Sequence, residues 1–139
     1  MKWSLIASVI GTLLAGCDVG HPRSDQTRND FALLTSMLDI YRLNSGRYPT
    51  TEQGLAALVN RPTTDPQPEI WTRIIDRVPL DPWGRDYRYQ CEFDAKTKIE
   101  TIVIWSVGRD GKDGSGDDIR HQVEYPRSVA SKLKAKENF

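Results

Sequence analysis

The 139-residue chain has few cysteines, which cross-link small secreted domains, and few histidines, which often act as catalytic bases. Its two cysteines, Cys17 and Cys91, are too few for a disulfide framework, so a single hydrophobic core has to hold the fold. Its two histidines, His21 and His121, accompany no recognised serine or cysteine nucleophile motif. We therefore expect no enzyme, no catalytic residues and no small-molecule substrate.

An excess of charge of either sign is also absent, because 19 Lys and Arg residues balance 19 Asp and Glu residues, with a pI near 6.7. Proteins that bind nucleic acids usually carry a basic excess, so the composition does not favour a nucleic-acid partner. Apolar residues make up 38% of the chain and charged residues 27%, which is typical of a soluble globular protein. The length predicts one domain.

The N-terminal apolar run is too short to span a bilayer. Residues 3–14 follow the positive charge of Lys2, and these 12 residues fall short of the roughly 20 that a transmembrane helix needs. Such a segment is typical of a secretory signal peptide. Residues 14–17, Leu-Ala-Gly-Cys, come next and resemble a lipobox. The resemblance implies cleavage before Cys17 and lipidation of its sulfur and its new amine; the alternative is an ordinary signal peptide with a chance cysteine at the cut.

Lipidation would hold the mature chain on the periplasmic side of a bacterial membrane. Several acyl chains, each contributing about 0.8 kcal/mol per buried methylene, anchor a protein stably. Asp18 resembles the residue that retains enterobacterial lipoproteins in the inner membrane, which slightly favours that membrane. We thus assign residues 1–16 to a signal peptide, and residues 17–28 to the lipidated cysteine and a polar tether.

An amphipathic helix is predicted after the tether. It should start near Ser24 or Asp25, either of which can cap free amide groups, and residues 44–46, Asn-Ser-Gly, should end it. The apolar residues at helical spacing are Phe31, Leu34, Leu38 and Tyr41. Three more are expected to widen this apolar face, namely Leu33, Met37 and Ile40.

The remaining sequence predicts short helical segments, turns and strands. Helical segments are expected at residues 51–59 and 71–75, on either side of a proline-containing loop at 61–69. Residues 81–84, Asp-Pro-Trp-Gly, predict a turn, because Asp caps, Pro fixes φ and Gly permits positive φ. Alternating or β-branched residues predict three strands, at 86–92, 99–106 and 119–125, with a hairpin loop at 94–97. Four residues are expected in or at the edge of the core, namely Trp71, Trp83, Trp105 and Cys91.

Three motifs stand in order along this region. Residues 41–55 read Tyr-Arg-Leu-Asn-Ser-Gly-Arg-Tyr-Pro-Thr-Thr-Glu-Gln-Gly-Leu, and residues 80–84 read Leu-Asp-Pro-Trp-Gly, followed by Tyr87 and Tyr89. The third motif is Ile-Trp-Ser-Val-Gly-Arg-Asp-Gly at 104–111, with Asp-Asp-Ile at 117–119. Together the motifs resemble those of the major pseudopilins of type II secretion systems.

This resemblance implies an α+β, pilin-like fold, in which an N-terminal amphipathic helix packs on a small antiparallel sheet with a calcium-binding loop. The pseudopilin-like domain would span residues 29–125, and a basic C-terminal tail would follow at 126–139. Pseudopilins begin with a prepilin leader and a long apolar helix that forms the filament core, whereas this chain has a lipobox and a tether. The fold is therefore expected to carry over, but the role of filament subunit does not follow automatically.

The segment from Gly108 to Asp118 combines glycines with four carboxylates, those of Asp110, Asp113, Asp117 and Asp118. Calcium takes six to eight oxygen ligands in flexible geometry, and glycines let the chain curl so that such oxygens converge. The resemblance implies calcium ligands from the side chains of Asp110, Asp117 and Asp118 and from the carbonyls of Val107 and Ser115, with Asp113 less certain. The alternative is a solvated Asp-Gly turn between two strands.

Two functions follow from these observations. The first is a lipid-anchored, structural or accessory role in type II secretion, with pseudopilins or other components of the secretion machinery as partners. The second is a calcium-binding periplasmic or surface lipoprotein that reuses the pilin-like domain as an interaction module without a role in secretion.

Overall fold

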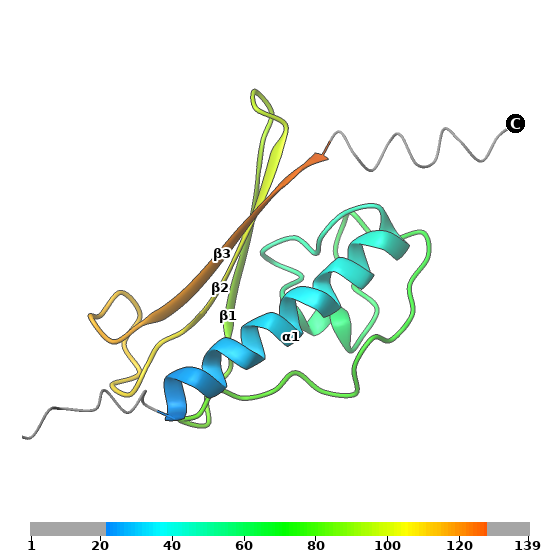
Figure 1. Ribbon diagram of the computed structural model, residues 1–139. Coiled ribbons are helices and arrows are strands. Elements are labelled where there is room, and N and C mark those ends of the chain that lie inside the picture. Colours follow the sequence, from blue (N-terminus) through cyan, green and yellow to red (C-terminus); the bar gives the residue numbers. More distant parts are fainter. Residues whose placement is uncertain (1–21, 128–139) are drawn as a thin grey trace, which may run out of the picture.

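The computed structural model describes residues 22–127, so the expected signal peptide, Cys17, Asp18 and residues 128–139 of the basic tail lie outside the described residues. The elements in chain order are α1 (Pro22–Ser45), the 3-10 helix η1 (Leu55–Leu58), β1 (Arg88–Asp94), β2 (Ile99–Ser106) and β3 (Ile119–Pro126). The three strands form one sheet, and α1 crosses one of its faces (Figure 1). Within this part of the chain, no helix is both long and apolar enough to cross a membrane.

Helix α1 begins earlier than the sequence predicts. Its first residue is Pro22, so residues 22–28, expected to belong to the tether, form its first two turns. Proline is well tolerated there, because the first turn of a helix has amide groups without intrahelical partners. The predicted end is confirmed: Gly46 has φ 79° and donates its N–H to the Arg42 carbonyl at 2.8 Å.

The apolar face of α1 is narrower than predicted. The buried positions match the predicted ones and are Phe31, Leu34, Leu38 and Tyr41. Leu33 and Ile40, expected to widen this face, are instead 46% and 42% exposed. They project away from the sheet because a single sheet can cover only one side of a helix; Met37, between the two sides, is partly buried against the core.

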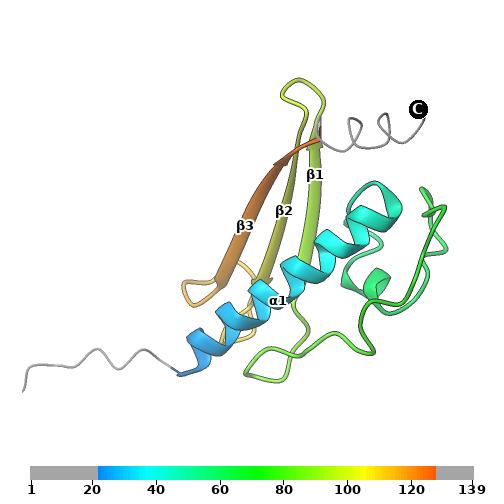
Figure 2. The same cartoon turned by 45° about the vertical axis from the view of Figure 1, so that its right-hand side comes forward.

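The sheet is antiparallel, with the strand order β1-β2-β3. Side chains of β2 alternate strictly between buried and half-buried, and Ile102 and Ile104 lie fully buried towards α1. Strand β1 starts at Arg88 rather than at Asp86, since Asp86 pairs with Leu80 in an isolated bridge that closes the preceding turn. Seen from a second direction, the sheet still carries α1 on one face only (Figure 2).

Tyrosine hydroxyls fasten α1 to the rest of the domain. Tyr87 on the chain entering β1 donates to Asp30 at 2.6 Å, and Tyr48 donates to Asp39 at 2.5 Å. Burial and the neighbouring Asp30 carboxylate raise the pKa of Tyr87 well above its ordinary value, so its hydroxyl keeps the proton that it donates. The amphipathic helix is thus held by polar contacts at two points along its length.

The segment after α1 is turned back by a reciprocal pair of hydrogen bonds. The Gln53 amide donates to the Thr50 hydroxyl at 3.2 Å, and the Thr50 amide donates to the Gln53 side chain at 3.1 Å. The predicted helix at residues 51–59 is confirmed only as the short η1. The predicted helical turn at 71–75 is wrong: Ile74 and Ile75 donate their amides to the Leu58 carbonyl, so this stretch lies extended along η1.

The predicted α+β fold, a helix packed on a small antiparallel sheet, is therefore confirmed, and its calcium-binding loop stays a prediction. One helix packs on a three-stranded antiparallel sheet. All three tryptophans are half-buried, and Trp71 packs against the core as expected. The prediction is wrong for Trp105, because the strand alternation places it on the sheet face that points away from α1. Cys91 is half-buried and packs against the core, as expected.

Candidate functional site

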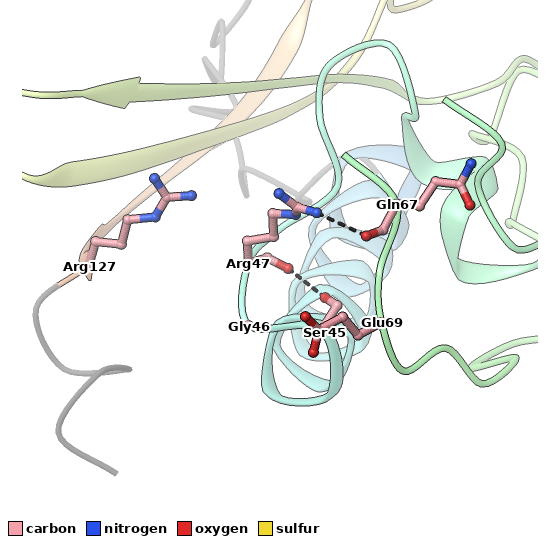
Figure 3. A pocket seen from close by; sticks show the side chains of 6 residues that line it. All are labelled: Ser45, Gly46, Arg47, Gln67, Glu69 and Arg127. Carbon is pink, nitrogen blue, oxygen red and sulfur yellow. Dashed lines mark hydrogen bonds between the residues drawn. The ribbon is translucent and has the colours of Figure 1, made fainter. Parts of the chain in front are cut away.

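A polar pocket of about 410 Å³ lies between the C-terminal end of α1 and the end of β3. Its lining includes Arg47, Glu69 and Arg127, and the Arg47 guanidinium donates to the carbonyl of Gln67 (Figure 3). The lining offers no pair of carboxylates and no nucleophile beside a base. Chemistry-bearing side chains gather instead at the opposite end of the sheet, where the glycine-rich loop joins β2 to β3.

The Asp-Pro-Trp-Gly turn at residues 81–84 lies next to this loop and supports it. The Asp81 carboxylate accepts the amides of Trp83 at 3.0 Å and Arg85 at 2.8 Å through Oδ1, and Gly84 has φ 80°. The predicted turn, with Asp as its cap, is confirmed. Asp81 is only 4% exposed, so its second oxygen also needs a partner inside the protein.

That partner is the last residue of β2. Ser106, fully buried, donates its hydroxyl to Asp81 Oδ2 at 2.6 Å and accepts the amide of Gly108 at 3.1 Å. One hydroxyl therefore connects the turn before β1 to the start of the glycine-rich loop. Serine fits here because its hydroxyl donates one proton and accepts another.

Arg85 makes a second connection between the turn and the loop. Its guanidinium donates to the carbonyls of Gly108 at 2.6 Å and Arg109 at 3.2 Å. Gly111 packs against the same guanidinium, which lies 2.8 Å from the position that a Cβ on this glycine would occupy. Arg85 could not be identified from the sequence, because an arginine after a turn glycine carries no local signal of a partner more than 20 residues away.

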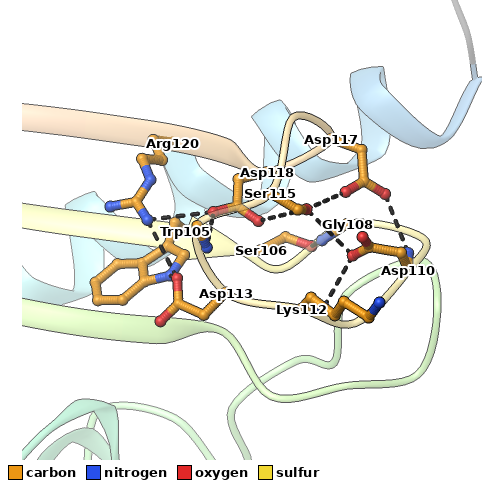
Figure 4. Close-up of polar contacts among 11 residues, drawn as sticks. Trp105, Ser106, Gly108, Asp110, Lys112, Asp113, Ser115, Asp117, Asp118 and Arg120 are labelled. Atoms are coloured by element: carbon orange, nitrogen blue, oxygen red, sulfur yellow. Dashed lines mark hydrogen bonds and ion pairs between the residues drawn. The ribbon is translucent and has the colours of Figure 1, made fainter.

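Three predicted calcium ligands converge on one hydroxyl (Figure 4). Ser115 Oγ lies 3.2 Å from Asp110 Oδ1, 2.5 Å from Asp117 Oδ1 and 3.5 Å from Asp118 Oδ1. A hydroxyl carries a single proton, so at most one of these carboxylates receives a full hydrogen bond from it. Three carboxylates therefore surround one hydroxyl group, which can donate its proton to only one of them.

Backbone amides bind the second oxygens of Asp117 and Asp118. Asp110 donates its amide to Asp117 at 3.0 Å, and Gly114 donates its amide to Asp118 at 2.8 Å. The Ser115 hydroxyl and the Asp110 amide lower the pKa of Asp117 to about 2. Asp117 is therefore fully ionised at neutral pH and supplies a permanent negative charge to the loop.

Gly108 allows Asp117 to lie across the start of the loop. It has φ 64°, and a Cβ at this position would lie 2.7 Å from Asp117 Oδ2, with a closer overlap onto the Asp117 carbonyl. A side chain at residue 108 would therefore meet both a strained backbone conformation and occupied space. Val107, the residue before it, is buried and fixes the loop to the core.

Asp113 does not bond to Ser115 but lies beside Trp105 and Arg120. It accepts the indole N–H of Trp105 at 2.9 Å and pairs with the Arg120 guanidinium at 3.1 Å. Arg120 also pairs with Asp118 at 3.2 Å and stacks on the Trp105 ring at 4.9 Å from its centroid. One cation therefore neutralises the outer side of the loop and leaves Asp110 and Asp117 without an ion pair among the described residues.

The fit of this loop to calcium rests on its donor chemistry. Within residues 22–127, no three His, Cys, Asp or Glu side chains are already gathered at metal-binding distances. The carboxylates that converge on Ser115 nevertheless offer only oxygen atoms as ligands. Hard cations such as calcium prefer oxygen ligands in flexible geometry.

Comparisons with known proteins agree with the motifs. The chain matches the family model for type II secretion system protein G over residues 17–123. It is 40% identical to the type II secretion system core protein G of Aeromonas hydrophila over 119 residues, which are 83% of this chain and 78% of that relative. It is 43% identical to the protein of the same name from Dickeya chrysanthemi over 93 residues, which are 66% of this chain and 58% of that relative.

Structural similarity points the same way. The crystal structure of the major pseudopilin from the type 2 secretion system of enterohaemorrhagic Escherichia coli matches with a TM-score of 0.63 and 40% sequence identity. The match covers 72% of this chain and 86% of that structure. Since the family model matches residues 17–123, which are most of the chain, the chain belongs to the type II secretion system protein G family.

Proposed function

We propose that this chain is a lipid-anchored pseudopilin-like protein with a structural or accessory role in type II protein secretion. The observation that carries the proposal is the way the second and third motifs fold into one unit. Ser106 bonds to Asp81, and Arg85 bonds to the loop carbonyls, so the residues that resemble pseudopilin signatures also support one another. The role is structural rather than enzymatic, and its partners are pseudopilins or other components of the secretion machinery.

The lipid anchor is the part of this proposal that distinguishes the chain from a filament-forming pseudopilin. It is supported by the lipobox at residues 14–17 and by the apolar segment before it. An anchored domain would stand on the periplasmic side of the membrane, with the inner membrane favoured by Asp18. Its helix α1 starts five residues after Cys17, so the domain would lie close to the membrane surface.

Calcium is the cofactor that the loop would bind. Asp110, Asp117 and Asp118 would supply carboxylate oxygens, and Val107 and Ser115 would supply backbone carbonyls. The ion would offset the negative charge that converges around Ser115 and would hold the loop against the turn at Asp81. Its contribution is structural, since it ties the two motifs to the end of the sheet.

The anchor is tested by metabolic labelling of cells with an alkyne analogue of palmitate, followed by capture of the chain. The wild-type chain and the Cys91→Ser variant should incorporate the label, and the Cys17→Ser variant should not. Label that persists in Cys17→Ser, or that is absent from the wild type, would disprove the anchor.

The role in secretion is tested by in-cell cross-linking of the lipidated chain and mass spectrometry, with Cys17→Ser as the control. We expect peptides from pseudopilins or other secretion components with the wild type, and fewer of them with the control. If a folded, abundant chain yields only unrelated partners, the calcium-binding lipoprotein without a secretion role takes the place of this proposal.

A further inference from the structure

The face of the sheet that points away from α1 carries an ordered pattern of charge. Residues 88–92 of β1 read Arg-Tyr-Gln-Cys-Glu, and residues 120–124 of β3 read Arg-His-Gln-Val-Glu. In both strands the tyrosine or histidine and the cysteine or valine face α1, since successive side chains of a strand point to opposite faces. The arginine, glutamine and glutamate of each strand therefore lie on the outer face.

The strand register aligns these residues into three rows across the sheet. Each row takes one residue from each strand, and the rows are Arg88–Trp105–Arg120, Gln90–Val103–Gln122 and Glu92–Thr101–Glu124. All nine side chains are half-buried or exposed, and no other described element covers this face (Figures 1 and 2). The row next to the glycine-rich loop carries two arginines, of which Arg120 is already paired with Asp113 and Asp118 and Arg88 is not. The middle row is neutral, and the row at the hairpin end carries two glutamates.

Charges of opposite sign on this face lie too far apart to neutralise one another within the chain. Arg88 and Glu92 are separated by about 13 Å along β1, since a strand rises about 3.4 Å per residue. Neither residue forms an ion pair within residues 22–127, and Glu92 accepts a hydrogen bond from Gln90 at 2.6 Å. Gln122 holds Glu124 in the same way at 3.1 Å. The glutamines therefore orient both carboxylates on the face without neutralising them.

We propose that this outer face binds the same face of a second copy of the chain, in a two-fold dimer whose axis runs along the row Gln90–Val103–Gln122. Rotation about this axis keeps each strand over its counterpart and reverses the order of the rows. Arg88, which has no ion pair among the described residues, then faces Glu92 of the second copy and gives the pairing that sets the register. Arg120, which is paired with Asp113 and Asp118 of its own chain, faces Glu124 of the second copy. Val103 lies over its own counterpart, and Trp105 lies over Thr101 of the second copy.

Charge complementarity favours a second copy of the chain as the partner of this face. A two-fold interface requires a surface that is complementary to itself, and a row of cations and a row of anions at equal distances from the axis satisfy that requirement. An arbitrary polar face exposed to water has no reason to repeat Arg, Gln and Glu in the same order on both edge strands. The nine residues of the face are fewer than the roughly 20 to 30 that each side of a standard interface contributes, so the dimer belongs to the weak class in which charge sets the register.

Cysteine cross-linking tests the position of the axis in the full chain in native membranes. Two sheets packed face to face lie about 10 Å apart, so a short bismaleimide can join residues that face their own counterparts. Val103→Cys and the more exposed Gln122→Cys should each give a covalent dimer. Thr101→Cys is the matched control: it lies on the same strand and face, but its counterpart is displaced by about 13 Å along the strand. The parent chain, which keeps Cys17 and Cys91, gives the background.

Charge reversal on β1 tests the complementarity separately from the loop, because neither Arg88 nor Glu92 forms a hydrogen bond or ion pair with a loop residue within residues 22–127. Arg88→Glu and Glu92→Arg should each lower the yield of the Gln122→Cys dimer at least fivefold, since each variant places like charges opposite one another. The double variant should recover the dimer, as should a mixture of the two single variants, in which every facing pair is again of opposite sign.

The results of the cross-linking and charge-reversal experiments distinguish a second copy of the chain from another protein, or from no partner, on this face. The proposal is supported if Val103→Cys and Gln122→Cys give covalent dimers and if the Arg88→Glu, Glu92→Arg double variant recovers the dimer yield. It is overturned if Thr101→Cys cross-links as well as Val103→Cys and Gln122→Cys, if both axis variants yield only conjugates with other proteins, or if they stay monomeric while their thermal melting matches that of the parent. It is also overturned if charge reversal has no effect on the dimer.

Discussion

Ser106 donates its buried hydroxyl to Oδ2 of Asp81 at 2.6 Å, and this bond joins the last residue of β2 to the turn before β1. The two residues are 25 positions apart and belong to different motifs. Asp81 has its other oxygen occupied by the amides of Trp83 and Arg85. The geometry of the glycine-rich loop therefore depends on a carboxylate that lies outside it.

We expect Ser106→Ala to lower the free energy of unfolding by about 1 to 3 kcal/mol, because it leaves a buried carboxylate oxygen without its donor. Urea denaturation monitored by tryptophan fluorescence measures the change. Ser36→Ala is the matched control, since the Ser36 hydroxyl is exposed and bonds only to the Ala32 carbonyl within α1. Its effect should stay within about 0.5 kcal/mol. Equal effects of the two substitutions would contradict the role given to Ser106.

Two glycines of the loop allow the backbone conformation to be separated from the space that a side chain needs. Gly108 and Gly114 both have positive φ, at 64° and 83°, but only the Cβ of residue 108 would overlap Asp117. Gly114→Ala should cost about 1 to 2 kcal/mol for the left-handed conformation alone. Gly108→Ala should cost clearly more and should displace Asp117, which NMR chemical shifts of the loop would report. A smaller effect at residue 108 than at residue 114 would be inconsistent with this packing.

Asp117 gives the loop a dependence on acidic pH. Its pKa is lowered from 3.8 to about 2 by the Ser115 hydroxyl and the Asp110 amide, so the folded state binds this proton less readily than the unfolded chain. The resulting stabilisation is present above about pH 4 and is lost as the pH falls towards 2. An NMR titration without calcium should show this low pKa, and Ser115→Ala should raise it. A titration near 3.8 in the wild type would refute the contact with Ser115.

The parts of the fold that the sequence predicts best are those set by local chemistry. The ends of β2 and the cap of the turn at Asp81 follow from β-branched residues and from one Asp-Pro-Trp-Gly segment. The exposed positions Leu33 and Ile40 could not be predicted, because periodicity shows which residues are apolar but not how wide a face the sheet covers. The helical turn predicted at residues 71–75 does not form, because the amides of Ile74 and Ile75 bond to Leu58 of η1, a contact that no local pattern reveals.

The residue types of the candidate site could be predicted from the sequence, but the contacts that hold its loop in place could not. The acidic and glycine residues of the loop were evident, whereas Arg85 and Ser106 act through contacts across 23 to 25 residues. The charged rows on the outer face depend in the same way on the register of three strands, which the sequence does not fix. Side chains whose role comes from a distant partner are the ones that required the structure.

Cys91 should be a slow thiol in the folded chain. Burial and the neighbouring Glu100 carboxylate, 3.8 Å from its sulfur, raise the pKa of Cys91 from 9.0 to about 11. Since the thiolate is the reacting form, iodoacetamide should label it far more slowly at pH 8 in the native state than in urea, measured in a Cys17→Ser background. Glu100→Gln should speed the native reaction by removing the negative charge. Equal labelling rates in the native state and in urea would show that Cys91 is exposed.

Calcium should stabilise the domain through the glycine-rich loop. Carboxylates that repel one another around Ser115 would gain a common cation, so calcium should bind the folded state in preference to the unfolded chain. At a thousandfold excess over its dissociation constant, it should add about 4 kcal/mol to the free energy of unfolding. Thermal melting with millimolar calcium, and again after chelator is added, measures this effect. Asp110→Ala should remove most of the shift, whereas Asp94→Ala, in the hairpin at the far end of the sheet, should keep it. A melting temperature indifferent to calcium, or a full shift in Asp110→Ala, would leave the loop as a solvated turn held by its own hydrogen bonds.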